Sequence, residues 1–205
     1  MYLSRIKLDL MRRTTGIAIA DRSYMHKAIE SCFEGARQRP VWEIDQDGQD
    51  RHLTIVSKDK PDLTRLIALY GQPGAKQETL EYEKYISEIK NGSEIRFHAT
   101  VAPITQIDGR EIPLNMNATK NFPWCAKDWF IKKMKAAGAD VAQLFPRGTE
   151  KTRFSHGEKS IPLTLMTFEG IAHVEDKDKF TTMLLAGMGR KKAYGGGLVM
   201  AYPTR

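Results

Sequence analysis

Hydrophobic and polar residues alternate with two different periods along the chain, and these periods predict strands and helices in turn. Residues 2–10 alternate between apolar and charged side chains, which is typical of a half-buried strand. Residues 11–22 are small and polar and predict a loop. From Ser23, a residue type that often caps helices, apolar residues recur at helical spacing until Gly35. The first third of the chain therefore predicts a strand, a loop and a helix.

The chain then completes one cycle of strands and helices. Two strands, at 41–46 and 52–57, flank the Asp-Gly pair at 47–48, which indicates a hairpin turn. A short helix is expected from Pro61, and residues 79–89 could close the unit as a strand. The order strand–helix–strand–strand–helix–strand is that of a ferredoxin-like domain.

A second cycle of the same order follows the Asn-Gly pair at 91–92. Its expected elements are a strand at 94–101, a hairpin around 107–110, a helix opened by Pro123, strands at 141–145 and 161–174, a helix at 176–186 and a strand at 197–202. The chain therefore predicts an α+β protein with two ferredoxin-like (RRM-like) βαββαβ domains in tandem, residues 1–90 and 91–205.

Composition narrows the class of protein. Of 205 residues, 41% are hydrophobic and 28% are charged, which argues against disorder. Only two cysteines occur, no apolar run approaches the roughly 18 residues of a membrane span, and the start lacks the apolar core of a signal peptide. We therefore expect a cytoplasmic protein without a membrane partner, monomeric when isolated.

The balance of 32 Lys and Arg against 25 Asp and Glu gives a formal charge of +7 and suggests an anionic partner. Cations gather at 1–13, 120–135 and the last 25 residues, whereas acids gather at 43–50 and 78–94. Such a chain can present one basic face to a phosphate backbone, with the acidic segments facing away. The alternative is a set of solvated faces without a partner.

Residues 187–197 form the most informative segment. Five glycines and three cations lie between a predicted helix and a predicted strand, so backbone N–H groups could approach a phosphate closely. The segment matches neither a P-loop nor a dinucleotide fingerprint, and a flexible turn is the alternative. The binding candidates in it are Gly187, Gly189, Arg190, Lys191, Lys192, Gly195 and Gly197.

His26 is the second candidate. With Ser23 as the cap it would be the third helical residue, where the helix dipole favours a phosphate. A histidine beside a phosphate can donate a proton to a leaving oxygen. Neighbouring Arg22 and Lys27 add charge and Tyr24 adds a hydroxyl. A surface histidine without a function is the alternative.

The basic loop expected at 147–160 is the third candidate. Its cations could follow a nucleic-acid groove through phosphate contacts, although a solvated connection is the alternative. These cations are Arg147, Lys151, Arg153 and Lys159. The other histidines and the acids lack the spacing of a metal site, so we expect neither a metal nor a cofactor.

Together these residues resemble the CasE-type CRISPR RNA endoribonucleases, the repeat-processing subunits of type I-E Cascade complexes. The resemblance rests on the opening Met-Tyr-Leu-Ser, Tyr-Met-His-Lys at 24–27, Phe-Glu-Gly at 168–170 and the glycine-rich tail. It implies two ferredoxin-like domains and a partnership with a CRISPR repeat RNA stem-loop and with other Cascade subunits.

The resemblance also implies a reaction. The family cleaves the repeat at the base of its hairpin without a metal, by attack of a 2′-hydroxyl that leaves a 2′,3′-cyclic phosphate and a 5′-hydroxyl. The family's catalytic histidine maps onto His26. A tyrosine stands three residues earlier in relatives, where this chain has Ser23, so Tyr24 is displaced by one position. Arg22, Ser23 and Lys27 are the alternatives to Tyr24 in this role.

Two other functions remain open from the sequence. One is a non-catalytic RNA-hairpin-binding protein on the same tandem fold, in which His26 is incidental. The other is a metabolic enzyme that binds a phosphate with the glycine-rich segment. Cleavage of a hairpin RNA and its dependence on His26 distinguish these possibilities.

Overall fold

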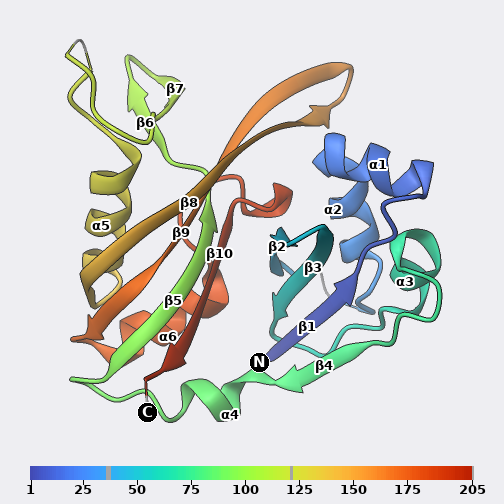
Figure 1. The fold of residues 1–205 in the computed structure, drawn as a ribbon, viewed down its shortest axis with the longest axis horizontal. Helices are drawn as coiled ribbons and strands as arrows, with labels where there is room; N and C mark the ends of the chain where they lie inside the picture. Colours follow the sequence, from blue (N-terminus) through green and yellow to red (C-terminus); the bar gives the residue numbers. More distant parts are fainter. Residues whose placement is uncertain (36–37, 121, 205) are drawn as a thin grey trace.

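A computed structural model describes residues 1–35, 38–120 and 122–204, and it contains two antiparallel four-stranded sheets flanked by helices (Figure 1). The elements of the first half are β1 (Tyr2–Lys7), α1 (Arg13–Ala20), α2 (Arg22–Glu30), β2 (Val41–Asp47), β3 (Asp50–Ser57), α3 (Thr64–Tyr70), β4 (Glu78–Glu81) and α4 (Tyr82–Ile86). Those of the second half are β5 (Glu94–Val101), β6 (Ile104–Ile107), β7 (Arg110–Pro113), α5 (Ala126–Ala136), β8 (Ala139–His156), β9 (Lys159–Val174), α6 (Lys177–Ala186), the 3-10 turn η1 (Lys192–Tyr194) and β10 (Gly197–Pro203).

The two main sheets share one strand order. The first runs β2-β3-β1-β4 and the second runs β10-β5-β9-β8, so each sheet places its first and third strands in the centre. Neighbouring strands are antiparallel in both sheets. Strands β6 and β7 form a separate two-stranded hairpin. The α+β class predicted from the sequence is confirmed.

Several predicted elements form where the pattern placed them. Strand β1 pairs with β3, and β2 and β3 are joined by a turn in which Gly48 has φ +61°. Strands β5 and β10 and the hairpin of β6 and β7 also match their predicted positions. Helix α6 begins after Asp176, whose carboxylate accepts a hydrogen bond from the N–H of Lys179.

The loop predicted at 11–22 is wrong, because this stretch contains α1 and the start of α2. Thr15 and Ala18 are the buried residues of α1, and both are too small to give a clear apolar stripe. This helix is stabilised by packing against α2 and α3. The Thr15 hydroxyl also donates a hydrogen bond to the carbonyl of Tyr70 in α3. The formation of α1 therefore depends on tertiary contacts and not on a local apolar pattern.

The predicted cap of the next helix is also wrong. Asp21 is the cap of α2, and its carboxylate accepts a hydrogen bond from the N–H of Ser23 at 3.0 Å. The helix ends at Glu30, before the predicted Gly35. His26 is thus the fifth residue of α2 and lies beyond the first turn, where the helix dipole acts most strongly.

Three further boundaries differ from the prediction. Only 78–81 of the segment expected to close the first sheet is a strand, and α4 follows at once. Helix α5 begins at Ala126, three residues after Pro123. The predicted loop at 147–160 belongs to β8 and β9, which continue past the sheet as one long hairpin turning after His156. The polar composition of this stretch reflects the exposure of most of its side chains, although Phe154 is buried.

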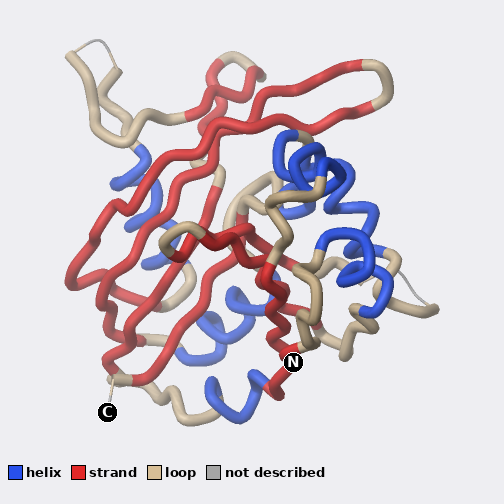
Figure 2. The backbone as a smooth tube through the Cα atoms, turned by 45° about the vertical axis from the view of Figure 1, so that its right-hand side comes forward, coloured by secondary structure: helices blue, strands red, loops and turns tan. Residues whose placement is uncertain are grey.

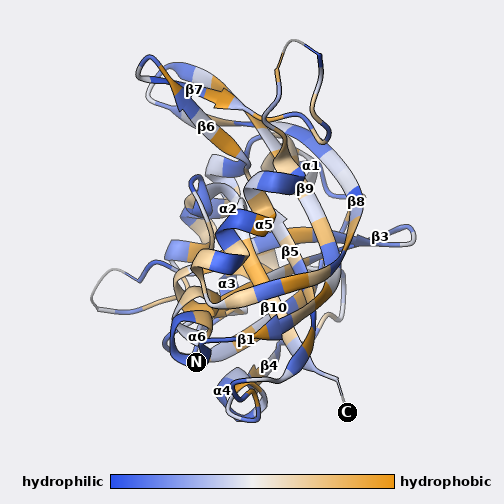
Figure 3. Ribbon diagram, turned by 90° about the vertical axis from the view of Figure 1, so that its left-hand side faces the viewer, coloured by the Kyte–Doolittle hydropathy of each residue, from blue (hydrophilic) through white to orange (hydrophobic). Residues whose placement is uncertain are grey.

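Helices cover the outer faces of the two sheets, and the inner faces approach each other (Figures 1 and 2). Apolar residues concentrate inside the layers, and the hairpin ends are hydrophilic (Figure 3). The cleft between the inner faces is lined by residues of both sheets, including Arg5, Asp45, Arg147 and Glu169. Among the described residues, no helix is long and apolar enough to cross a membrane.

Candidate functional site

Side chains from three distant segments meet beside the outer half of the long hairpin, close to its turn. The ring of Tyr194, in η1, lies edge-on to the imidazole of His26, in α2, with 5.5 Å between ring centroids. The same ring stacks on Phe154 of β8, with centroids 3.9 Å apart and planes 15° apart. The fold thus brings the predicted histidine, the glycine-rich segment and the basic hairpin together.

His26 is partly buried at this meeting point. Its side chain is 20% exposed, and Nε2 lies 3.4 Å from a carboxylate oxygen of Glu30, one turn further along α2. A partly exposed imidazole beside a carboxylate can hold a proton and donate it to a group bound at its open side. The position fits a proton donor.

Tyr24 is not brought to the same place. Residues two positions apart on a helix point about 200° apart, so Tyr24 leaves α2 on a different side from His26. Burial raises the pKa of Tyr70 in α3, and the nearby Tyr24 adds to this rise. Tyr24 therefore lies toward α3, half exposed, and the structure does not pair it with His26.

Arg22 and Ser23 are buried, which conflicts with their predicted contact with RNA. The Arg22 guanidinium has no exposed surface, and its Nη2 donates to both carboxylate oxygens of Glu150 at 2.8 Å. Burial lowers the pKa of Arg22, and the Glu150 charge opposes this. The Ser23 hydroxyl accepts from the N–H of Ser155 at 2.7 Å and donates to its carbonyl at 3.0 Å. Both residues fasten α2 to the hairpin, whereas Lys27 is exposed.

The glycines of 187–197 have a packing role in this structure. Gly187 has φ +72°, and a Cβ there would lie 2.5 Å from Cγ1 of Val41. Gly195 has φ +84° and lies against the Trp42 ring, 3.1 Å from the place a Cβ would take. Gly189 and Gly197 also lack room for a side chain. The segment is therefore a tightly packed turn, in place of the open phosphate cradle that its composition suggests.

The three cations of this turn differ in their surroundings. Arg190 and Lys191 each bind a carboxylate oxygen of Glu111 in β7 at 2.7 Å. Lys191 has left-handed backbone angles, φ 62° and ψ 23°, and its Nζ lies 5.5 Å from the centroid of the Phe154 ring. Lys192 is half-buried, and its aliphatic stem packs beside Gly197. Positive charge is thus held close to Tyr194 but is partly neutralised by one acid.

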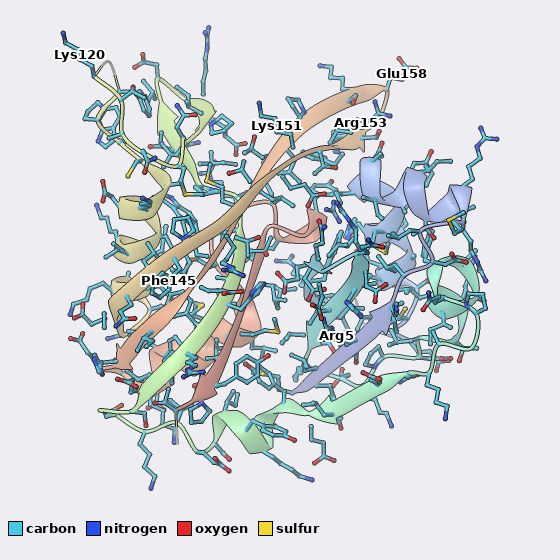
Figure 4. The ribbon with its side chains drawn as sticks, in the orientation of Figure 1. Arg5, Lys120, Phe145, Lys151, Arg153 and Glu158 are labelled. Atoms are coloured by element: carbon cyan, nitrogen blue, oxygen red, sulfur yellow. The ribbon has the colours of Figure 1, made fainter. Side chains whose placement is uncertain are left out.

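The outer part of the β8–β9 hairpin carries unneutralised positive charge. Lys151, Arg153 and Lys159 are exposed, and within the described part of the chain they form no ion pair. Figure 4 shows Lys151 and Arg153 along the projecting ribbon and Glu158 at its tip. Arg147 lies nearer the sheet and pairs with Glu169 at 3.2 Å. The projecting part is the strongest candidate for a phosphate contact.

The acids at 43–50 do not form a simple outward-facing surface. Glu43 is fully buried and lies 3.1 Å from Nε2 of His98, whose Nδ1 lies 3.4 Å from Glu169. Burial alone would lower the pKa of His98, but the hydrogen bonds and charges of Glu43 and Glu169 raise it to about 9. Within 1–35, 38–120 and 122–204, no group of three His, Cys, Asp or Glu side chains could hold a metal ion.

Sequence and structure comparisons place the chain among CRISPR proteins. The model of the family described as "CRISPR associated protein" matches residues 1–203. The CRISPR-associated endoribonuclease Cse3 of Thermus thermophilus is 23% identical, over 99% of this chain and all of that protein.

Two solved structures show the same fold. A CRISPR endoribonuclease Cse3 bound to a 19-nucleotide RNA superposes with a TM-score of 0.80 at 19% identity, over 99% of this chain and 100% of that chain. A chain of a CRISPR RNA-guided surveillance complex superposes with a TM-score of 0.67 at 19% identity, over all of both chains. The match over nearly the whole length confirms the resemblance seen in the motifs, and the chain belongs to the CRISPR associated protein family.

Proposed function

We propose that this chain is a metal-independent endoribonuclease that cleaves CRISPR precursor RNA within the repeat, at the base of its stem-loop. The observation that carries the proposal is the placement of His26 against Tyr194, which in turn stacks on Phe154 in the outer half of a basic hairpin. Membership of the family and the endoribonuclease activity named for the Thermus relative support it.

The proposed reaction needs a proton donor and no bound oxidant or reductant. The ribose 2′-hydroxyl loses its proton to solvent water, and its oxygen forms a bond to the adjacent phosphorus while the bond from phosphorus to the 5′-oxygen breaks. His26 gives its proton to the departing 5′-oxygen, which leaves a 2′,3′-cyclic phosphate and a 5′-hydroxyl. Lys191 and Lys192, in the turn that holds Tyr194, would offset charge on the phosphorane.

The stem would be held through its shape and its phosphates. The exposed cations Lys151, Arg153 and Lys159 of the hairpin and Lys27 of α2 are the proposed contacts, joined by the turn at 190–192. Arg22 and Ser23 leave this set because they are buried in contacts with the hairpin. Tyr24 leaves the catalytic set because it lies on another side of α2.

We further propose that each sheet with its helices is a ferredoxin-like domain, divided near residue 90, because each sheet draws its strands from one range and has the 4-1-3-2 order of that fold. The Cse3 structure with bound RNA and the similar chain in a surveillance complex support a CRISPR RNA partner and assembly with other Cascade subunits. The chain would keep its cleaved RNA in that assembly. We also retain a cytoplasmic location and a monomeric isolated chain as proposals.

Replacing His26 tests the proposed activity. For His26→Ala we expect single-turnover cleavage of a repeat hairpin to slow by about 10²- to 10⁴-fold, because the general acid is lost. The dissociation constant for a 2′-deoxy, uncleavable hairpin should stay near the parental value. His173→Ala, an exposed histidine on the far part of β9, is the matched control and should cleave at the parental rate.

The same assay separates the alternatives. Parental cleavage by His26→Ala would show that this histidine is not the acid. Binding of the hairpin without cleavage by the parent protein would support the non-catalytic RNA-binding function instead. Cleavage should persist in EDTA, and its loss in EDTA with recovery in magnesium would contradict the metal-independent mechanism.

A further inference from the structure

We infer that Tyr194 is a positioning residue that sets the orientation of the His26 imidazole and links it, through Phe154, to the β8–β9 hairpin. This inference rests on the proposed function, because it concerns the group that donates the proton. Tyr194 acts through its ring, which packs on two other rings from different elements. The sequence pattern gave this tyrosine no role among the glycines and cations around it.

The turn that carries Tyr194 is rigidly held. Lys191 and Gly195, on either side of η1, both have left-handed backbone angles, and the N–H of Tyr194 donates to the carbonyl of Lys191 at 2.9 Å. Trp42 Nε1 donates to the carbonyl of Ala193 at 3.2 Å, and its ring packs on Gly195. A non-glycine residue in the left-handed region persists only when its surroundings enforce it, so the turn has one defined conformation.

The contact with His26 leaves the imidazole little freedom. The planes of the two rings are 68° apart, an edge-to-face arrangement that aromatic rings favour. Glu30 engages Nε2 from the same helix. Because the ring is packed on one side and engaged by a carboxylate at one nitrogen, its rotation about both side-chain bonds is restricted. General acid catalysis requires such a defined direction for the N–H bond.

Phe154 connects this arrangement to the hairpin. It is 4% exposed and packs with Ala102, Leu163 and Leu165, in the outer half of the hairpin and close to its turn. Its ring stacks on Tyr194, and Lys191 lies over it. A shift of this outer half of the hairpin would therefore move Tyr194, and with it the support of His26. RNA bound on the outer hairpin would thus act on the same rigid unit that orients the acid.

Two substitutions of Tyr194 test this role. For Tyr194→Leu, which removes the ring, we expect single-turnover cleavage to slow by about 10- to 100-fold while the dissociation constant for the uncleavable hairpin stays within about twofold. Tyr194→Phe keeps the ring and should cleave within about threefold of the parent. The cleavage rate of Phe154→Leu should lie between those of Tyr194→Leu and Tyr194→Phe. Tyr85→Leu, which changes a half-exposed tyrosine of α4, is the matched control and should have no effect.

A spectroscopic readout separates positioning from general destabilisation. The ring resonances of His26, assigned by their absence in His26→Ala, should shift and broaden in Tyr194→Leu and return to parental positions in Tyr194→Phe. The other histidine resonances should stay unchanged in both variants. Loss of the fold would alter all of them.

Each remaining outcome is decisive. Parental cleavage and unchanged His26 resonances in Tyr194→Leu would overturn the inference and leave the proposed function intact, provided that His26→Ala is inactive. An equal loss of cleavage rate in Tyr194→Phe and Tyr194→Leu would assign the effect to the Tyr194 hydroxyl and overturn the positioning role of the ring. Weakened hairpin binding in Tyr194→Leu, in step with slower cleavage, would make this residue an RNA contact. Parental cleavage by His26→Ala would instead contradict the proposed function itself.

Discussion

At the scale of single residues, Arg22 shows how a cation can serve the site without touching a ligand. Its guanidinium has no exposed surface, lies 5.9 Å from the Trp42 ring centroid and is bound by both oxygens of Glu150. The pair joins the start of α2 to β8, two elements that approach the candidate site. A buried charge of this kind needs its partner, because an unpaired one has lost its hydration without compensation.

Removal of the partner should therefore destabilise the protein strongly. For Glu150→Gln we expect the free energy of unfolding to fall by about 3 kcal/mol, measured by urea denaturation. The double variant Arg22→Met with Glu150→Gln should lose less than the sum of the two single losses. Arg51 makes a longer contact to the same carboxylate, 3.3 Å from its partly exposed guanidinium. Arg51→Met should therefore lower the free energy of unfolding by at most about 1 kcal/mol. If the loss of unfolding free energy in the double variant equalled the sum of the two single losses, Arg22 and Glu150 would not be a coupled buried pair.

At the scale of elements, the outer half of the β8–β9 hairpin has two kinds of contact. Near the hairpin turn, β8 is fastened to α1 and α2, where Thr152 donates to the carbonyls of Ile19 and Ala20 and Ser155 bonds to Ser23. The same stretch carries the exposed cations, of which Figure 4 labels Lys151 and Arg153. The backbone of the hairpin therefore belongs to the rigid frame of the site, and its exposed cations are available to a ligand.

Neutralising the outer part should weaken RNA binding and its salt dependence together. For the triple variant of Lys151, Arg153 and Lys159 to alanine, we expect the slope of log K against log salt to fall by roughly two to three units, since each phosphate contact contributes about one. Fluorescence anisotropy with a labelled hairpin from low to physiological salt measures this slope.

A matched triple variant provides the control. Lys58 and Lys60, between β3 and α3, and Lys90, between α4 and β5, are exposed cations outside the hairpin and the glycine-rich turn. Their replacement by alanine changes the net charge equally and should leave the slope nearly unchanged. An equal decrease of the salt slope in both triple variants would mean that net charge alone attracts the RNA.

At the scale of the whole molecule, the two halves share their interior. The largest buried cluster includes Val41 and Val56 of the first sheet together with residues of the second sheet, such as Val199. Tyr82 of α4 accepts a hydrogen bond from the N–H of Ala201 in β10 and donates to its carbonyl. Glu43 and His98 add a polar contact between β2 and β5. The site, which takes residues from both halves, depends on this junction.

The junction should make stability depend on pH. The pKa of His98 is about 9 in the folded protein, against an ordinary value of 6.5, so the folded state binds the proton more tightly than the unfolded chain. Its contribution is fully present below pH 6.5 and is lost as the pH rises through 9. We expect the free energy of unfolding to fall by roughly 3 kcal/mol at most across this window.

Unfolding by urea at several pH values measures this dependence. The His98→Gln variant should be less stable than the parent at pH 6, because Glu43 loses its charged partner, and its stability should change little between pH 6.5 and 9. The same pH dependence in parent and variant would show that another group is responsible.

Much of the fold follows from local sequence. Alternation predicted β1 and β5, the Asp-Gly pair predicted the β2–β3 turn, and Asp176 with Gly187 marked the ends of α6. The importance of His26, of the hairpin and of the glycine-rich segment was also visible as residue types in a local pattern, although their roles stay proposals. Helix α1 was missed because its buried residues are small, and its stability comes from neighbours far away in the sequence.

The sequence by itself determined the α+β class, most strands and the segments that carry chemistry, because turns, caps and apolar periods depend on residues within a few positions. Tertiary structure alone decided which side chains meet. It buried Arg22 and Ser23, turned Tyr24 away, and placed Tyr194 between His26 and Phe154. The contacts of Arg22, Ser23 and His26 join residues more than 100 positions apart, and they depend on how two sheets and a long hairpin pack, which no local period encodes.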